Sequence, residues 1–252
     1  MRADFNTRYR FQVEVDQHGR EVPPTYFDPE EQALISLFEE TVRQEIEKVR
    51  IGTKTNNSEL SMAELGSNQA YYSLLFRSML REHGIPGRSL MVEPYDPFMT
   101  RSVRHMELNG FVQGTVFDRR SIGGEWKAWN GYKFEHGTVS VDGLMQEHGL
   151  PHLHVLHADI DGSELIMLEG AKRALTSASI SHLFVLTHGS DLHSQCREMM
   201  LESHGERYEL AVDEDNGSHG TDGLLYFRER EARGGIRCRE HQSGFPTRSG
   251  SS

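Results

Sequence analysis

Short apolar runs and longer amphipathic segments alternate along the middle of the chain. The apolar runs lie at residues 61–65, 89–93, 112–117, 153–159, 180–187, 208–212 and 223–229. The amphipathic segments, with apolar residues every three or four positions, lie at residues 69–83, 97–109, 141–148, 163–175 and 190–204. Short apolar runs predict buried strands, and the three-to-four spacing predicts helices with one apolar face. The chain therefore alternates between predicted strands and predicted helices.

This alternation predicts an α/β domain over residues 58–230. Helices between consecutive strands supply the crossovers that parallel strands need, whereas the last two apolar runs follow each other without a helix. We therefore expect an open, mostly parallel sheet that is closed by a final pair of strands.

Two flanking regions differ from this central pattern. Residues 1–57 are predicted to form an N-terminal extension with an edge strand or hairpin, followed by a helix at 29–50 that begins with Asp28 as N-cap and Pro29. The apolar face of that helix is expected to pack on the sheet; covering a ligand site or forming a homodimer are the alternatives. Residues 231–252 are rich in Gly, Ser and Arg, which predicts a disordered tail.

Composition excludes several classes of partner. The chain has 252 residues and a formal net charge of −11, which argues against binding to nucleic acid or to an anionic membrane. No apolar run approaches the roughly 18 residues of a membrane-spanning helix, and the N-terminus lacks the apolar core of a signal peptide. The two cysteines, Cys196 and Cys238, match no metal or disulfide spacing. We expect a soluble, cytoplasmic protein.

Candidate binding residues follow the first two predicted strands. In an open parallel sheet, ligands bind outside the carboxyl ends of the strands. The first strand ends in "AELGSN", where Gly66 allows a close backbone approach and small polar residues precede a helix. The second ends at Glu93, whose carboxylate is placed to accept hydrogen bonds from ribose hydroxyls. The two sites together predict a nucleoside ligand, and the missing G-x-G-x-x-G pattern disfavours a dinucleotide and with it a nicotinamide-dependent oxidoreductase.

Three stretches resemble the successive motifs of FkbM-type S-adenosylmethionine-dependent methyltransferases. They are "AELGSNQAYYSLLF", "MVEPYDPFMTRSVRHMELNG" and "VDGLMQEHGLPHLHVLHADIDGSELIMLEGAKRAL", and the resemblance covers about residues 60 to 210. It implies the class I methyltransferase fold, a Rossmann-like three-layer sandwich with a seven-stranded sheet whose last strand is antiparallel.

The resemblance also implies a role for each matching residue in binding S-adenosylmethionine. Under the methionine part of the cofactor it places Glu64, Gly66, Ser67 and Asn68. Glu93 would bind the ribose hydroxyls, Asp118 to Ser121 would approach the adenine, and Asp159 would face the methionyl group or the acceptor. Ala70 departs from the family, which usually has glycine there, and would add a methyl group near the cofactor.

Two predicted strand ends supply candidates for catalysis. A hydroxyl acceptor must lose a proton on methylation, and His188, directly after the fifth predicted strand, is the natural general base, with Asp159 as the second catalytic residue. Further titratable residues lie close by in the sequence: His157, Asp161, Glu164, Asp191 and His193. A Mg²⁺ ion held by Asp159 and His188 is an alternative. Glu164 is interpreted as a helix-start residue, and His157 as a satisfied histidine of the sheet.

These observations predict an S-adenosylmethionine-dependent methyltransferase. The expected reaction is O-methylation of a small hydroxylated metabolite, sugar or natural-product intermediate. A catalytically degenerate cofactor-binding or partner-binding module of the same fold is the alternative, and Ala70 would favour it. The glycine-rich segment 119–137, with its four aromatic residues, is predicted to form either a lid over the acceptor or a self-packed loop.

Overall fold

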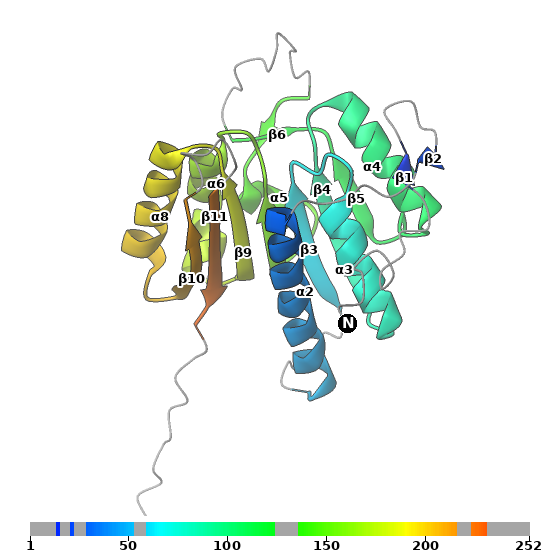
Figure 1. Cartoon of the computed structure of the whole chain (residues 1–252), viewed down its shortest axis with the longest axis horizontal. Helices are drawn as coiled ribbons and strands as arrows, with labels where there is room; N and C mark the ends of the chain where they lie inside the picture. Colours follow the sequence, from blue (N-terminus) through cyan, green and yellow to red (C-terminus); the bar gives the residue numbers. More distant parts are fainter. Residues whose placement is uncertain are drawn as a thin grey trace, which may run out of the picture.

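A seven-stranded sheet with helices on both faces forms the body of the protein (Figure 1). The computed structural model describes residues 14–15, 21–22, 29–52, 59–123, 136–215 and 223–230. The tail at 231–252 and the aromatic residues Trp126, Trp129, Tyr132 and Phe134 lie outside these ranges. Within them, no helix is both long and apolar enough to cross a membrane.

The strand order is that of a doubly wound sheet with one reversal. The strands are β3 (Leu60–Leu65), β4 (Gly87–Val92), β5 (Thr115–Asp118), β8 (Leu153–Ala158), β9 (Ile180–Thr187), β10 (Tyr208–Glu214) and β11 (Gly223–Glu229), in the order β10-β11-β9-β8-β3-β4-β5. Strand β11 pairs antiparallel with both of its neighbours, β9 and β10, and the pairs among β5, β4, β3, β8 and β9 are parallel. The predicted seven-stranded sheet with one antiparallel strand is confirmed.

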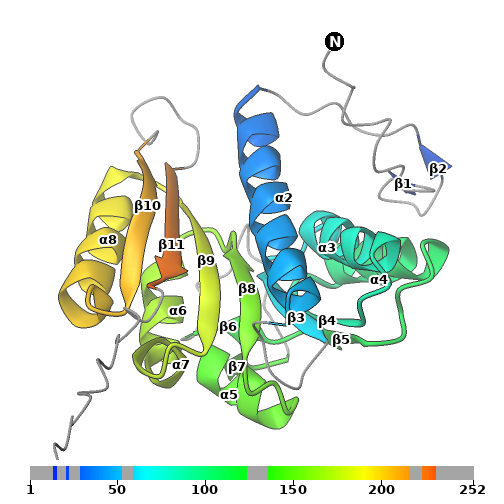
Figure 2. The same ribbon diagram turned by 90° about the horizontal axis from the view of Figure 1, so that it is seen from below.

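Helices cover the two faces in separate groups, as Figure 2 shows. One group consists of α2 (Pro29–Arg50), α3 (Tyr71–Glu82) and α4 (Asp96–Leu108); the other consists of α5 (Val141–Glu147), α6 (Glu164–Gly170), α7 (Lys172–Thr176) and α8 (Ser190–His204). The first three helices precede or connect the strands from β3 to β5, and the others connect the strands from β5 to β10. The switch in face occurs at β3, so the carboxyl end of this strand faces the crevice where such sheets bind ligands.

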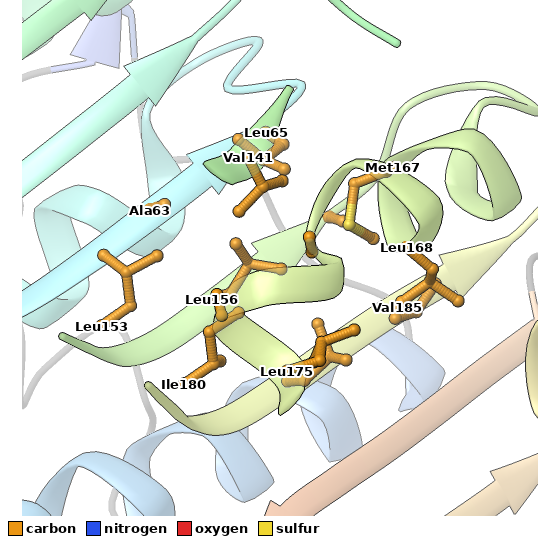
Figure 3. Close-up of a cluster of buried hydrophobic side chains, with 14 of the residues drawn as sticks. Ala63, Leu65, Val141, Leu153, Leu156, Met167, Leu168, Leu175, Ile180 and Val185 are labelled. Carbon is orange, nitrogen blue, oxygen red and sulfur yellow. The ribbon is translucent and has the colours of Figure 1, made fainter. Parts of the chain in front are cut away.

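The larger apolar core lies between the sheet and the second group of helices (Figure 3). Alternate residues of β3 and β8 point into it, such as Ala63, Leu65 and Leu156, because successive side chains of a strand face opposite sides. Met167 and Leu168 of α6 and Leu175 of α7 fill the space between the strands and the helices. This packing holds α6 and α7 against the sheet.

Helix α2 closes the opposite face. Its apolar residues Ile35, Phe38, Val42 and Ile46 are buried against β3, β9, β11 and α3, as their three-to-four spacing predicts. A buried polar network adds to this contact: Glu45 Oε1 lies 3.2 Å from His182 Nε2, and His182 Nδ1 lies 2.8 Å from the Tyr226 hydroxyl. Glu45 also accepts a hydrogen bond from Lys48. The helix is therefore held by both apolar and charged contacts.

Several predicted boundaries shift for local reasons. The single helix expected at 163–175 is two helices, because the backbone at Ala171 leaves the helical region (φ −101°, ψ 8°) after Gly170, a weak helix former. The helix expected from residue 69 starts at Tyr71, since Asn68 and Ala70 have positive φ. The strand expected at 112–117 begins only at Thr115, after Gly114 with φ +82°.

Two short strand pairs lie outside the main sheet. In the N-terminal extension β1 (Glu14–Val15) and β2 (Glu21–Val22) pair antiparallel, as in the predicted hairpin. Strands β6 (Ser121–Ile122) and β7 (Thr138–Val139) pair parallel and were not predicted, because two residues are too few to give a pattern. This second pair joins the two ends of the segment 119–137.

Candidate functional site

The carboxyl ends of five parallel strands meet at one edge of the sheet and carry most of the predicted site. Gly66 follows β3, Glu93 follows β4, Asp159 follows β8 and His188 follows β9, while Asp118 is the last residue of β5. Backbone hydrogen bonds continue beyond the strands: Gly66 N donates to Val92 O at 2.8 Å and Asp159 N donates to Leu65 O at 3.0 Å. The first residues after the strands therefore stay in register.

Gly66 is required by this close approach. Its φ is +77°, and a Cβ atom placed on it would lie 1.8 Å from the carbonyl oxygen of Asp159. Only glycine combines that backbone angle with that contact. The turn after β3 therefore lies directly against the residue that follows β8.

The next turn residues lead the chain into α3. Asn68 is exposed at φ 38°, and Ala70 has φ 65° directly before the helix, an angle at which glycine is favoured. Ala70 is fully buried in an apolar cluster with Leu74 and Met91, between α3, α4 and β4. Its methyl group is therefore part of this small apolar cluster, directly after the glycine turn.

Glu64 supports the turn from below. It is buried on β3, and its two carboxylate oxygens accept hydrogen bonds from Tyr72 N at 3.1 Å and Ser73 N at 3.0 Å. Burial raises the pKa of Glu64 to about 7, against the lowering effect of the hydrogen bonds from Ser73 and Tyr72. The carboxylate thus caps the first turn of α3 and fixes the helix relative to the strand.

Two residues of α4 hold the same turn from the side. Ser102 Oγ donates to Asn68 O at 2.9 Å and lies 3.3 Å from Ser67 Oγ, and His105 Nδ1 lies 2.7 Å from Gln69 O. The Ser67 side chain is buried in this contact. Sequence reasoning missed Ser102 and His105; the available signal was the position of two polar residues on the buried face of α4, beside Met99 and Met106.

Glu93 joins the turns that follow β3 and β4. Its Oε2 accepts a hydrogen bond from Asn68 N at 3.1 Å and its Oε1 accepts one from Tyr95 N at 2.9 Å. Burial raises the pKa of Glu93, with the N–H groups of Tyr95 and Asn68 acting in the opposite direction. Each carboxylate oxygen has a second lone pair. Glu93 is therefore an acceptor-only group between two turns, which is the kind of group expected to accept hydrogen bonds from the hydroxyls of a ribose.

Asp118 and Ser121 lie one strand further out. The Asp118 carboxylate accepts bidentate hydrogen bonds from Arg120, which also pairs with Glu147 at the end of α5. Burial raises the pKa of Asp118, but the hydrogen bonds and charge of Arg120 outweigh it and hold that pKa below its usual value. Ser121 is buried, and its Oγ has no hydrogen-bond partner in the described ranges. Asp118 is thus committed to an ion pair, while Ser121 keeps an unused hydroxyl.

His188 is the centre of a cluster of carboxylates. Its Nδ1 lies 2.9 Å from Glu164 Oε1, and its Nε2 lies 3.4 Å from Asp159 Oδ1 and 3.3 Å from Asp161 Oδ1. The Glu164 side chain is fully buried, whereas those of Asp159 and Asp161 are 41% and 63% exposed. The imidazole thus has one nitrogen against the protein interior and the other at the open side of the site.

The remaining candidates lie elsewhere. His193 is buried between Thr187 and Asp213, with 2.8 Å and 2.9 Å contacts, and so joins α8 to the sheet. His157 points to the α2 side of the sheet, stacked on Tyr72 with ring centroids 3.9 Å apart. Neither of its ring nitrogens has a hydrogen-bond partner among the described residues, so the expectation of a satisfied histidine is wrong. Asp191 is exposed at the start of α8.

The alternative of a Mg²⁺ ion involves Asp159 and His188, at this edge of the sheet. In the part of the chain that the structure describes, no group of three or more His, Cys, Asp and Glu side chains is arranged to hold a metal ion. Three carboxylates at the edge, those of Asp159, Asp161 and Glu164, lie around the two nitrogens of His188.

Comparison with known proteins finds likeness in structure only. No protein-family model matches the sequence, and no curated protein matches it either. Among solved structures, the methyltransferase FkbM from Methylobacillus flagellatus KT is 18% identical with a TM-score of 0.52, over 70% of this chain and 45% of that one. The METTL16 MTase domain is 10% identical with a TM-score of 0.57, over 90% of this chain and 77% of that one.

These likenesses agree with the topology derived above. A human methyltransferase 10 domain containing protein also matches, at 10% identity and a TM-score of 0.50, over 89% of this chain and 92% of that one. The chain spans less than half the length of the FkbM structure. Together with the seven-stranded sheet and its single antiparallel strand, the likenesses define a class I methyltransferase fold.

Proposed function

We propose that this chain is an S-adenosylmethionine-dependent methyltransferase of the FkbM type. The observation that carries the proposal is the arrangement of Gly66, Glu93, Asp159 and His188 at one edge of a methyltransferase sheet. The proposed acceptor is a hydroxyl oxygen of a small metabolite, a sugar or a natural-product intermediate. A hydroxyl acceptor must lose its proton on methylation, and His188 is placed to take that proton as general base.

The residues present fit the cofactor. Glu93 would hold the ribose hydroxyls through its unused lone pairs, and the turn at Gly66 would lie beneath the methionine part. The carboxylate of Asp159, at the open side of the site, would hold the ammonium group of the methionyl moiety. Bound S-adenosylmethionine supplies a methyl group on a positively charged sulfur, which a nucleophilic oxygen can take in an in-line displacement.

His188 would supply the proton transfer. Its Nε2 faces the open side, next to the exposed Asp159 and Asp161. The acceptor hydroxyl would give its proton to Nε2 as the bond from its oxygen to the methyl carbon forms and the bond from that carbon to sulfur breaks. The surrounding carboxylates stabilise the imidazolium that results. The other contribution of the protein is to align donor and acceptor.

Transfer of a labelled methyl group tests this proposal. Protein incubated with tritium-labelled S-adenosylmethionine and a panel of hydroxylated sugars and metabolites is expected to label at least one acceptor. His188→Ala is expected to lower turnover by about 10² to 10⁴ with cofactor binding unchanged. His83→Ala, at an exposed position after α3, serves as the control. Full turnover in His188→Ala would show that His188 is not the general base.

A further inference from the structure

Glu164 connects two parts of the site: the loop between β8 and α6, to which it is adjacent, and His188, which lies 24 residues further along the chain. Its Oε1 accepts hydrogen bonds from Ile160 N at 3.3 Å and Gly162 N at 3.2 Å, and lies 2.9 Å from His188 Nδ1. The side chain is fully buried, and Oε2 has no hydrogen-bond partner among the described residues. A carboxylate that only capped the loop before α6 would not need to contact His188, which follows a different strand.

The loop held by Glu164 also shapes the other side of His188. Asp161 has φ 48° and Gly162 has φ 94°, so the chain turns sharply between β8 and α6. This turn brings the Asp159 and Asp161 carboxylates to Nε2, while Glu164 stays at Nδ1. One buried oxygen therefore fixes both the ring and the loop that carries its two exposed neighbours.

We infer that Glu164 is the positioning residue for His188 in the proposed reaction. An anionic acceptor at Nδ1 keeps a proton on that nitrogen and leaves Nε2 to exchange protons with the acceptor. The buried carboxylate also holds the plane of the imidazole ring. Of the three carboxylates, only Glu164 contacts Nδ1, and rotation of the ring would break that contact. The catalytic role of this contact rests on the proposed function, but the contact between Glu164 and His188 can be tested without an acceptor substrate.

The test is proton and nitrogen NMR of protein labelled with ¹⁵N-histidine. A histidine Nδ1–H that donates to a buried carboxylate gives a protected, downfield resonance, and His188→Gln identifies it by its loss. Glu164→Gln is the informative variant, because the amide oxygen can replace Oε1 toward all three donors while the charge is removed. Glu169→Gln, exposed on the same helix, is the matched control.

We expect the His188 resonance to be present in the wild type and in Glu169→Gln, and to move upfield or disappear in Glu164→Gln. An unchanged resonance in Glu164→Gln, or none from His188 in the wild type, would overturn the inference. Titration of the same samples with S-adenosylmethionine separates this result from the proposed function. Failure to bind would reject the cofactor assignment even where the resonance behaves as expected.

Discussion

The backbone of Gly66 and the carbonyl oxygen of Asp159 approach each other so closely that a methyl group cannot fit between them. Gly66→Ala would place its Cβ 1.8 Å from that oxygen, at a φ of +77°. We expect a loss of at least about 3 kcal/mol in the free energy of unfolding, since the clash is with backbone and adds to the cost of the positive φ.

Gly162→Ala is the matched control, because Gly162 has φ +94° with no atom within 4 Å of the added Cβ. Its expected cost is only the strain of the positive φ, about 1 to 2 kcal/mol. Denaturant unfolding of both variants measures the difference. Equal losses would show that β3 and β8 end further apart than described.

His157 is a second residue whose effect on the free energy of unfolding can be measured. Its unpartnered ring is packed among Tyr72, Phe38 and Phe184. We expect His157→Phe to stabilise the protein at pH 7 by about 1 to 3 kcal/mol, because it removes buried polar atoms without partners. His154→Phe is the control on the same strand. His154 Nδ1 accepts a hydrogen bond from Ser61 N, and the substitution would leave that buried N–H without its acceptor. The free energy of unfolding should therefore fall, by about 1 to 3 kcal/mol.

The same histidine predicts a dependence of stability on pH. Burial lowers the pKa of His157 from 6.5 to about 3. Below pH 6.5 the unfolded chain takes up a proton that the folded protein does not, so stability is lost as the pH falls from 6.5 toward 3. The loss from this group alone is of order 4 to 5 kcal/mol over that range. Unfolding free energies of wild type and His157→Phe should therefore diverge in acid; parallel curves would contradict the assignment.

At the scale of elements, the question is whether the N-terminal helix α2 folds and unfolds together with the sheet. Phe38 is fully buried and contacts Tyr72 and Phe184. We expect Phe38→Ala to lower the free energy of unfolding by about 3 to 5 kcal/mol, with a single transition. Ser36→Ala, exposed on the same helix, should change it by less than about 0.5 kcal/mol. A separate early transition in Phe38→Ala would show that α2 unfolds independently of the sheet.

Elements differ in how far their sequence predicts them. The buried residues of α2 follow from spacing alone, and β9 occupies the predicted range because every position in "ISHLFVLT" suits a central strand. The break between α6 and α7 follows Gly170, a weak helix former, but many helices continue through a single glycine, so the sequence alone does not predict it. The start of α3 depends on positive φ at Ala70, a position where the residue type gives no warning.

At the scale of the whole molecule, the site could be predicted where it follows from topology. Glu93, Asp159 and His188 lie at the same edge of the sheet because each comes directly after a parallel strand. The partners that hold them could not be predicted, since contacts such as Glu164 to His188 join residues 24 apart whose relation depends on loop geometry. For Ser102 and His105, the sequence shows only that they lie on the apolar face of α4; their contacts with the turn after β3 depend on how the helix packs.

Binding of the cofactor at this edge is the central claim, and calorimetric titration with S-adenosylmethionine and S-adenosylhomocysteine tests it most directly. Wild type and Glu82→Gln, changed at an exposed position of α3, are expected to bind both in the micromolar range and to ignore NADH. Glu93→Gln should weaken binding by about 1 to 3 kcal/mol, roughly five- to 150-fold. Absence of binding in the wild type, or equal affinity in Glu93→Gln, would contradict the account.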